Sequence, residues 1–137
     1  MQQDRRERII PMAKRILIVE DEPNIVVPLQ FSLEQKRYQV SVAESGEEAI
    51  DQIAKFKPDL ILLDIMLPGI DGFEVCQTVR QNPETRDTKV VFLSAMGRDI
   101  DVAKGMALDA DAYIIKPFSI LEVMETVGNL LAGSQEP

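Results

Sequence analysis

Histidine and tryptophan are absent from this chain of 137 residues, and cysteine occurs once, at Cys76. Without histidine there is no Ser-His-Asp triad, no imidazole acid or base, and no histidine ligand for a metal. If the chain handles phosphate, any phosphohistidine must therefore belong to a partner. A single cysteine excludes an internal disulfide and any metal site built from several cysteines. Because Cys76 recurs with Phe73 and Val79 at helical spacing, we expect a buried thiol rather than a nucleophile.

Long apolar runs are also lacking. No segment approaches the roughly 20 apolar residues that span a bilayer, and no secretory signal is evident. We therefore expect a cytoplasmic protein without membrane insertion. The net charge of −8 argues against nucleic acid as a direct partner, because phosphate backbones need a basic surface.

Basic residues are concentrated near the N-terminus. Up to Arg15 there are five basic and two acidic residues, which leaves ten of the 15 basic and 21 of the 23 acidic residues for the remainder. A chain of this length with 45% hydrophobic residues is expected to form one domain. We expect a flexible basic leader over 1–13, the domain over 14–132 and a frayed tail over 133–137.

Apolar, β-rich runs alternate with amphipathic helical patterns along the rest of the chain. The expected strands are 15–20, 39–43, 59–64, 89–93 and 112–115, and the expected helices are 24–37, 46–56, 72–82, 98–108 and 119–132. Strands that are apolar on both faces, separated by helices of this length, indicate an α/β fold. In such a fold a parallel sheet is covered by helices on both sides.

Four of the five expected strands end at, or just before, a chemically distinctive residue. These are Glu20-Asp21 after the first strand, Asp64 at the third, Ser94 after the fourth and Lys116 after the fifth. Because right-handed crossovers bring the carboxyl ends of parallel strands to one edge, we expect these side chains to lie together. Three carboxylates at that edge would repel unless a cation joined them. Oxygen ligands without His or Cys favour Mg²⁺.

A carboxylate, a hydroxyl, an ammonium and Mg²⁺ at one sheet edge predict phosphoryl transfer. Asp64 would be the nucleophile and would form an acyl phosphate. Mg²⁺ and Lys116 would neutralise charge on the phosphoryl oxygens, and Ser94 would donate a hydrogen bond. Taken singly, such residues have simpler explanations, since Asp and Glu commonly favour helix starts and turns. Their coincidence at four strand ends favours the chemical explanation.

The segments RILIVEDEPN, PDLILLDIMLPGIDGFEV, VVFLSA and DAYIIKPFS stand in the order and spacing of a known family. With them the chain resembles the receiver domain of two-component response regulators, of the single-domain, chemotaxis-regulator-like type. The resemblance covers roughly 14–132. It implies a flavodoxin-like fold: a doubly wound, five-stranded parallel sheet with strand order 2-1-3-4-5 and five helices.

The resemblance also implies which residues receive the phosphoryl group and hold the metal. Asp64 takes the place of the phosphorylated aspartate, and it shares the metal with Glu20 and Asp21. The backbone carbonyl of Met66 matches a further metal ligand.

Four more positions match residues of the family, two of them in its switch. Ser94 matches the switch hydroxyl and Tyr113 the switch aromatic residue. Lys116 matches the family's lysine, and Pro117 follows what is usually a cis peptide bond in this family.

The partners implied by the resemblance are of two kinds. A histidine kinase or a histidine phosphotransfer protein supplies the phosphoryl group, which agrees with the absence of histidine here. An output protein docks on the face formed by the fourth helix, the fifth strand and the fifth helix. The chain is then not an enzyme but a phosphoacceptor that assists its own phosphorylation and dephosphorylation.

The last expected helix is apolar at more positions than one buried stripe needs. We therefore expect an exposed docking face on it, for a partner or for a homodimer. The apolar positions are Ile120, Leu121, Val123, Met124, Val127, Leu130 and Leu131.

Three alternatives stay open at this point. An aspartyl-phosphate phosphatase would need a second acid two residues after the nucleophile, where this chain has Met66. A non-phosphorylated interaction module would keep the fold without the chemistry. The chain could also be a receiver excised from a larger regulator.

Overall fold

The computed structural model describes residues 13–133, and the side chains of 13–132. The strands are β1 (Arg15–Val19), β2 (Gln39–Ala43), β3 (Leu60–Asp64), β4 (Lys89–Ser94) and β5 (Ala112–Ile115). The helices are α2 (Pro23–Gln35), α3 (Gly46–Phe56), α4 (Gly72–Gln81), α5 (Asp99–Ala107) and α6 (Ile120–Gly133). The expected leader and tail lie almost wholly outside the described residues. Within them, no helix is both long enough and apolar enough to cross a membrane.

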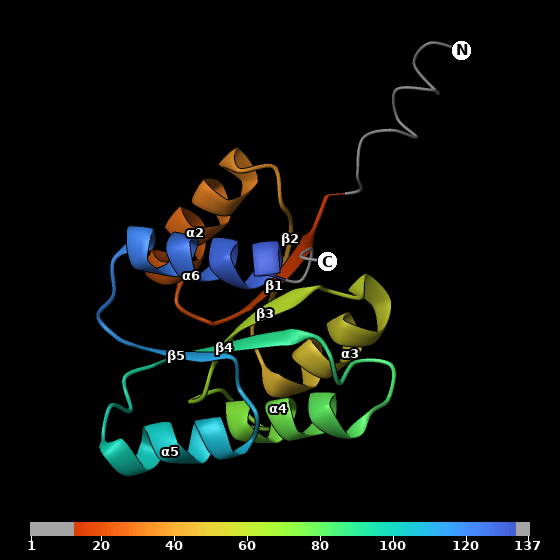
Figure 1. Ribbon diagram of the computed structural model, residues 1–137, viewed down its shortest axis with the longest axis vertical. Coiled ribbons are helices and arrows are strands. Elements are labelled where there is room, and N and C mark those ends of the chain that lie inside the picture. The colour runs from red at the N-terminus through yellow and green to blue at the C-terminus, as the bar shows by residue number, and fades with distance from the viewer. Residues whose placement is uncertain (1–12, 134–137) are drawn as a thin grey trace.

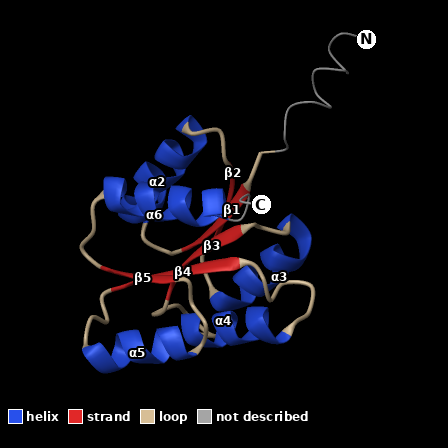
Figure 2. Ribbon diagram, in the orientation of Figure 1, coloured by secondary structure: helices blue, strands red, loops and turns tan. Residues whose placement is uncertain are grey.

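The five strands form one parallel sheet in the order β2-β1-β3-β4-β5. Figure 1 shows α2 and α6 on one face of the sheet and α3, α4 and α5 on the other. In Figure 2 the strands form a single layer between these two groups of helices. The predicted doubly wound fold, with its strand order and five helices, is confirmed.

Alternate strand residues belong to separate cores on the two faces of the sheet. Ile16 and Ile18 pack with the buried residues of α2 and α6. Leu17 and Val19 pack with those of α3 and α4. All five residues of β3 are buried. Because both faces are covered, these strands carry continuous apolar runs instead of an alternating pattern.

Local capping explains where the helices begin and end. At the start of α3, Ser45 Oγ accepts a hydrogen bond from the Glu48 N–H at 3.1 Å. At the start of α4, Asp71 and Glu74 form a reciprocal capping box. The helix α2 ends two residues earlier than expected because Arg37 adopts a left-handed conformation, with φ of 72°. A residue in the left-handed conformation ends a helix. When that residue is not glycine, the hydrophobic periodicity of the sequence gives no sign of it.

Cys76 is fully buried in α4, as expected. Burial raises the pKa of its thiol to about 11. The thiolate is the reactive form of cysteine, so a buried thiol with a raised pKa is suited to packing rather than to nucleophilic attack.

Gly128, inside α6, offers a test of local helix stability. A Cβ atom at this position would meet nothing within 4 Å. Because glycine inside a helix costs about 0.5–1 kcal/mol relative to alanine, we expect Gly128→Ala to raise the free energy of unfolding by about that amount. Urea unfolding followed by circular dichroism measures the change.

The matched control for this substitution is Gly72→Ala at the start of α4. A Cβ atom there would lie 2.4 Å from the carbonyl oxygen of Asp64, so we expect a loss of stability. A Gly128→Ala protein that is no more stable than wild type would contradict the prediction.

Candidate functional site

The carboxyl ends of four neighbouring strands bring the predicted residues to one edge of the sheet. Asp64 ends β3 and pairs in register with Leu93, one residue before Ser94. Ser94 ends β4 and pairs with Ile115, one residue before Lys116. In the same way β1 pairs with β3 up to Val19 and Leu63, so that Glu20 follows beside Asp64.

Three carboxylates form a compact cluster at this edge. Glu20, Asp21 and Asp64 each place an oxygen so that the three oxygens lie within 4.8 Å of one another. Glu20 is fully buried and Asp64 is 4% exposed, whereas Asp21 is exposed to solvent. The cluster therefore has two fixed acids at its base and one acid at its rim.

Within the described residues, the only buried side-chain oxygen without a hydrogen bond is Glu20 Oε1. It lies 2.9 Å from Lys116 Nζ, but the geometry of this ion pair falls short of a hydrogen bond. A buried acceptor with spare capacity, beside two further carboxylates, is a suitable ligand set for a hard cation. These residues thus fit a bound Mg²⁺.

Lys116 provides the positive charge in this cluster. Its ammonium lies 2.9 Å from Glu20, 3.3 Å from Glu22 and 3.4 Å from Asp64. Burial raises the pKa of Glu20, with a further increase from the charge of Asp64, while Lys116 opposes the shift. Burial lowers the pKa of Lys116, but its acidic neighbours outweigh that effect and the net pKa is raised.

Two loops after the strands position the remaining backbone groups. Asp64 Oδ1 accepts a hydrogen bond from the Met66 N–H at 3.2 Å. Ser94 is fully buried, and its hydroxyl accepts one from the Met96 N–H at 3.0 Å. Met66 is 65% exposed, and because hard cations prefer oxygen to a thioether, its backbone carbonyl is the ligand group that it can offer. In each loop, the side chain that ends the preceding strand is therefore hydrogen-bonded to the backbone two residues further on.

Tyr113 lies behind Ser94 on β5. Its hydroxyl donates to the carbonyl of Met96, and its ring lies 5.8 Å from that of Phe92. A Cβ atom on Gly105 of α5 would lie only 3.0 Å from the Tyr113 ring, so the glycine leaves room for this ring position. The Lys116-Pro117 peptide bond is cis.

Sequence reasoning missed two residues that the structure places in important positions. Glu22 follows the predicted acidic pair Glu20-Asp21 and had no role assigned to it, yet its carboxylate contacts Lys116. Arg80 carried no recognisable signal, although its guanidinium hydrogen-bonds to Arg86, Thr88, Asp109 and Asp111.

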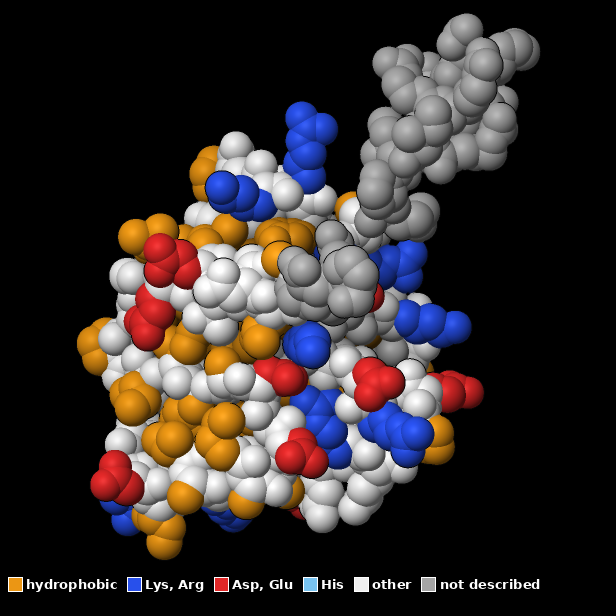
Figure 3. Space-filling model, in the orientation of Figure 1, with side chains coloured by type: hydrophobic (Ala, Val, Ile, Leu, Met, Phe, Trp, Pro, Cys, Tyr) orange, Lys and Arg blue, Asp and Glu red, His pale blue; other side chains and the backbone are white. Residues whose placement is uncertain are grey.

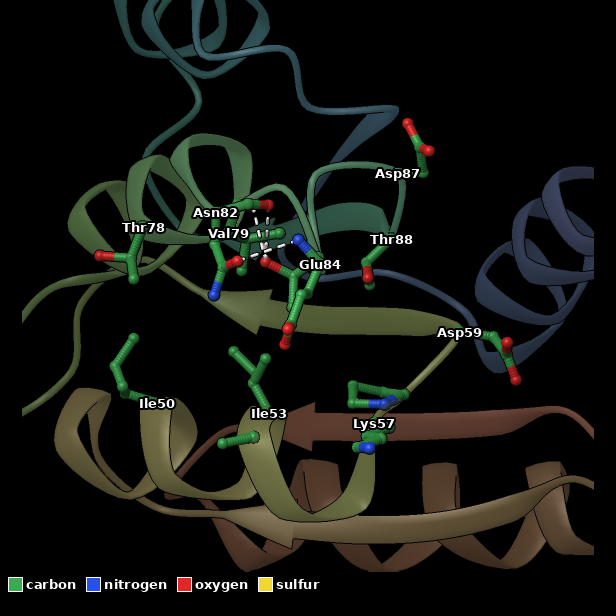
Figure 4. Close-up of a pocket in the computed structure, with 13 residues that line it drawn as sticks. Ile50, Ile53, Lys57, Asp59, Thr78, Val79, Asn82, Glu84, Asp87 and Thr88 are labelled. Atoms are coloured by element: carbon green, nitrogen blue, oxygen red, sulfur yellow. Dashed lines mark hydrogen bonds between the residues drawn. The ribbon is translucent and has the colours of Figure 1, made fainter.

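A separate cavity of about 710 Å³ lies between α3 and α4, near the start of β3. Figure 4 shows Ile50 and Ile53 of α3 on one side and Thr78 of α4 on the other. One of the hydrogen bonds drawn there runs from the Glu84 N–H to Asn82 Oδ1 and lies within a surface loop. This cavity contains none of the predicted site residues and lies at the opposite edge of the sheet.

The last helix exposes less apolar surface than expected. Of its seven apolar residues, three are buried, three are half-buried and only Leu121, at 67%, is exposed. Leu130 is half-buried against the core, so a substitution there would disturb packing as well as any docking.

More apolar surface lies on α5 and β5, where Ile100, Met106 and Ile115 are exposed. Figure 3 shows hydrophobic side chains gathered on the left of the view, between α6 and α5.

Comparison with known proteins identifies the family. The family model described as the response regulator receiver domain matches residues 16–128. The chain is 44% identical over 124 residues to the alkaline phosphatase synthesis transcriptional regulatory protein PhoP of Bacillus subtilis. It is 39% identical over 120 residues to the phosphate regulon transcriptional regulatory protein PhoB of Rhizobium meliloti. These matches cover 90% and 88% of this chain but only 51% and 53% of the relatives, so the chain spans about half their length.

Solved structures of response regulators share the fold of this chain. A putative response regulator from Chloroflexus aurantiacus is 38% identical, with a TM-score of 0.82 over 88% of this chain and 99% of that one. A CheY-like receiver domain protein from Methanospirillum hungatei is 27% identical, with a TM-score of 0.83 over 89% and 96% of the two chains. The family match, the relatives and the shared fold agree: this chain belongs to the response regulator receiver domain family.

Proposed function

We propose that the domain over 14–132 is the phosphoacceptor switch of a cytoplasmic two-component system or phosphorelay. Asp64 receives a phosphoryl group from a phosphohistidine on a histidine kinase or a histidine phosphotransfer protein. The observation that carries this proposal is a nearly buried aspartate with two acids and a lysine grouped around it. Such a group of charges is costly to bury and has little use in packing alone.

The proposed reaction is an in-line phosphoryl transfer. A carboxylate oxygen of Asp64 attacks the phosphorus, and the bond between phosphorus and the donor nitrogen breaks. The bonding pair leaves with that nitrogen, and because the other ring nitrogen of the phosphohistidine carries a proton, the imidazole departs neutral and the second product is an aspartyl phosphate. The Lys116 ammonium and the Ser94 hydroxyl donate to phosphoryl oxygens.

Glu20, Asp21, Asp64 and the Met66 carbonyl would hold Mg²⁺. When bound, the ion neutralises charge shared by the carboxylates and the phosphoryl group. The protein thereby acts as a phosphoacceptor that assists its own phosphorylation and dephosphorylation. It does not turn over a separate substrate.

The output of the switch is proposed to lie on α5, β5 and α6. The aspartyl phosphate would carry roughly −1.5 to −2 charges beside Ser94, in place of the single negative charge of the Asp64 carboxylate. A movement of Ser94 would reach Tyr113 through the β4–α5 loop, since the Tyr113 hydroxyl is bonded to Met96 of that loop. The exposed apolar residues of α5 and β5 offer a surface for an output protein. On α6, Leu121 is the residue to substitute in testing a partner contact or a homodimer.

Intact-protein mass spectrometry with Mg²⁺ and a small acyl-phosphate donor tests the proposal. We expect one phosphoryl adduct on wild type, no adduct on Asp64→Ala, and no adduct after the metal is removed with a chelator. An adduct that survives Asp64→Ala would contradict the assignment of Asp64. A folded wild-type protein that accepts no phosphoryl group, even from a cognate kinase, would favour an interaction module without this chemistry.

A further inference from the structure

Lys116 donates one of its hydrogen bonds to a residue that the proposed chemistry does not use. Its ammonium donates to Asp64 Oδ2 at 3.4 Å and to Glu22 Oε1 at 3.3 Å. The side chains of Glu20 and Asp64 are 0% and 6% exposed, whereas that of Glu22 is 60% exposed. Of the three acids around Lys116, Glu22 alone can turn into solvent without a change in the buried part of the site.

The orientation of Glu22 is not explained by its own helix. It occupies the N-cap position of α2, but its side chain makes no capping hydrogen bond. Short polar side chains such as Asp or Ser at this position accept from the free N–H groups of the first helical turn, and any negative charge there is favoured by the helix dipole. Instead, the carboxylate reaches Lys116, 94 residues further along the chain. Its backbone N–H donates to Glu20 Oε2 at 3.3 Å, which ties the turn to the same cluster.

Glu22 and Lys116 also face a common space at the surface. The two residues line a groove of about 600 Å³, together with Ile25 and Pro28 of α2 and Phe118 after β5. A small anionic donor that enters through this groove meets the Glu22 carboxylate beside the ammonium. The ammonium is then already engaged by Glu22 when the donor arrives.

We propose that Glu22 is a positioning residue that holds the Lys116 ammonium in the resting protein and releases it when a phosphoryl group arrives. This inference rests on the proposed phosphoacceptor function. An ammonium has three N–H donors, and the one directed at Glu22 becomes available to a phosphoryl oxygen once Glu22 turns away. Because an exposed ion pair contributes little stability, breaking the contact between Glu22 and Lys116 costs little free energy.

The rate of adduct formation on Glu22→Gln tests this role. We expect phosphorylation by a small acyl-phosphate donor to be about two- to fivefold faster than in wild type, the range set by one exposed ion pair. The matched control is Glu44→Gln, which removes the same charge from an exposed residue just after β2, at the same edge of the sheet. We expect no change of rate for this control. In a Lys116→Met background, Glu22→Gln should no longer accelerate the reaction.

A second readout needs no phosphorylation. Acetylation of Lys116 by an amine-reactive ester, followed by peptide mass spectrometry, reports how freely the amine is available. We expect Glu22→Gln to raise the labelling rate of Lys116 about two- to fivefold, with the exposed Lys55 as internal standard.

Two results would overturn the role of Glu22. One is equal acceleration by Glu22→Gln and Glu44→Gln, which would mean that only overall charge matters. The other is unchanged labelling of Lys116. Failure of the proposed function itself looks different, because wild type and Glu22→Gln would then both lack the phosphoryl adduct, whatever the labelling result.

Discussion

Lys116→Met is expected to lower the free energy of unfolding by about 2–4 kcal/mol in buffer without divalent cations. The substitution keeps a long side chain but removes the ammonium that lies within 3.4 Å of Glu20, Glu22 and Asp64. Two of these carboxylates are buried and would lose their counter-ion, and removal of one partner from a buried pair costs several kcal/mol. We place the expected loss below the top of that range because the Lys116 side chain is 15% exposed.

Mg²⁺ and pH should both modify this loss of stability. Added Mg²⁺ should restore part of it, because a cation that binds only the folded state stabilises that state. The pKa of Glu20 is raised in the folded protein by burial and by Asp64. A raised pKa means that the folded protein takes up the proton first as pH falls, so the deficit should shrink as pH is lowered through the pKa of Glu20.

Urea unfolding of wild type and Lys116→Met, with and without Mg²⁺, measures these effects. The matched control is Lys55→Met, which removes the same charge from an exposed pair with Asp51. We expect a change of no more than about 0.5 kcal/mol there. Equal losses in the two variants would show that Lys116 does not compensate the buried acids.

Arg80→Met is expected to lower the free energy of unfolding by about 2–4 kcal/mol, without a direct effect on the site. The guanidinium donates to the carbonyls of Arg86 and Thr88 at 2.9 and 2.6 Å, and twice to that of Asp109 at 3.0 and 2.8 Å. It also donates to Asp111 Oδ2 at 3.0 Å. Hydrogen bonds of charged groups contribute about 1.5–3 kcal/mol each, but these share one side chain and are not additive.

The same side chain joins three segments at the amino-terminal edge of the sheet. Asp111, which Arg80 holds, also accepts the N–H of Val90 at 2.8 Å. Loss of Arg80 should therefore loosen the loop before β4 and the turn before β5 together. Thermal unfolding and hydrogen exchange of these segments measure the effect.

Arg86→Met is the matched control, because it removes the same charge from an exposed side chain and keeps the carbonyl that Arg80 uses. Arg80→Lys should remain destabilised, since a lysine keeps the charge but lacks the planar fork of donors. A Lys variant as stable as wild type would mean that charge alone accounts for the contribution.

The sequence by itself determined the order and type of every element within residues 13–133. Five apolar runs are separated by helical patterns. Because both faces of such strands must be covered, this order predicts a doubly wound parallel sheet with helices on each face. Boundaries were missed where a local conformation has no periodic signal, as at left-handed Arg37, which ends α2 early. The sequence also placed Glu20, Asp21, Asp64 and Lys116 at strand ends, and the structure brings them together. Their chemical roles stay predictions that the phosphorylation experiments address.

The tertiary structure alone decided which side chains are partners. Asp21 and Glu22 are adjacent and both exposed, yet Asp21 joins the carboxylate cluster and Glu22 pairs with Lys116. Arg80 reaches Asp111 across 31 residues, and Glu22 reaches Lys116 across 94. Periodicity and capping act between residues a few positions apart. Contacts of this range depend on how the sheet twists and how the loops turn, so they appear only when the chain is folded.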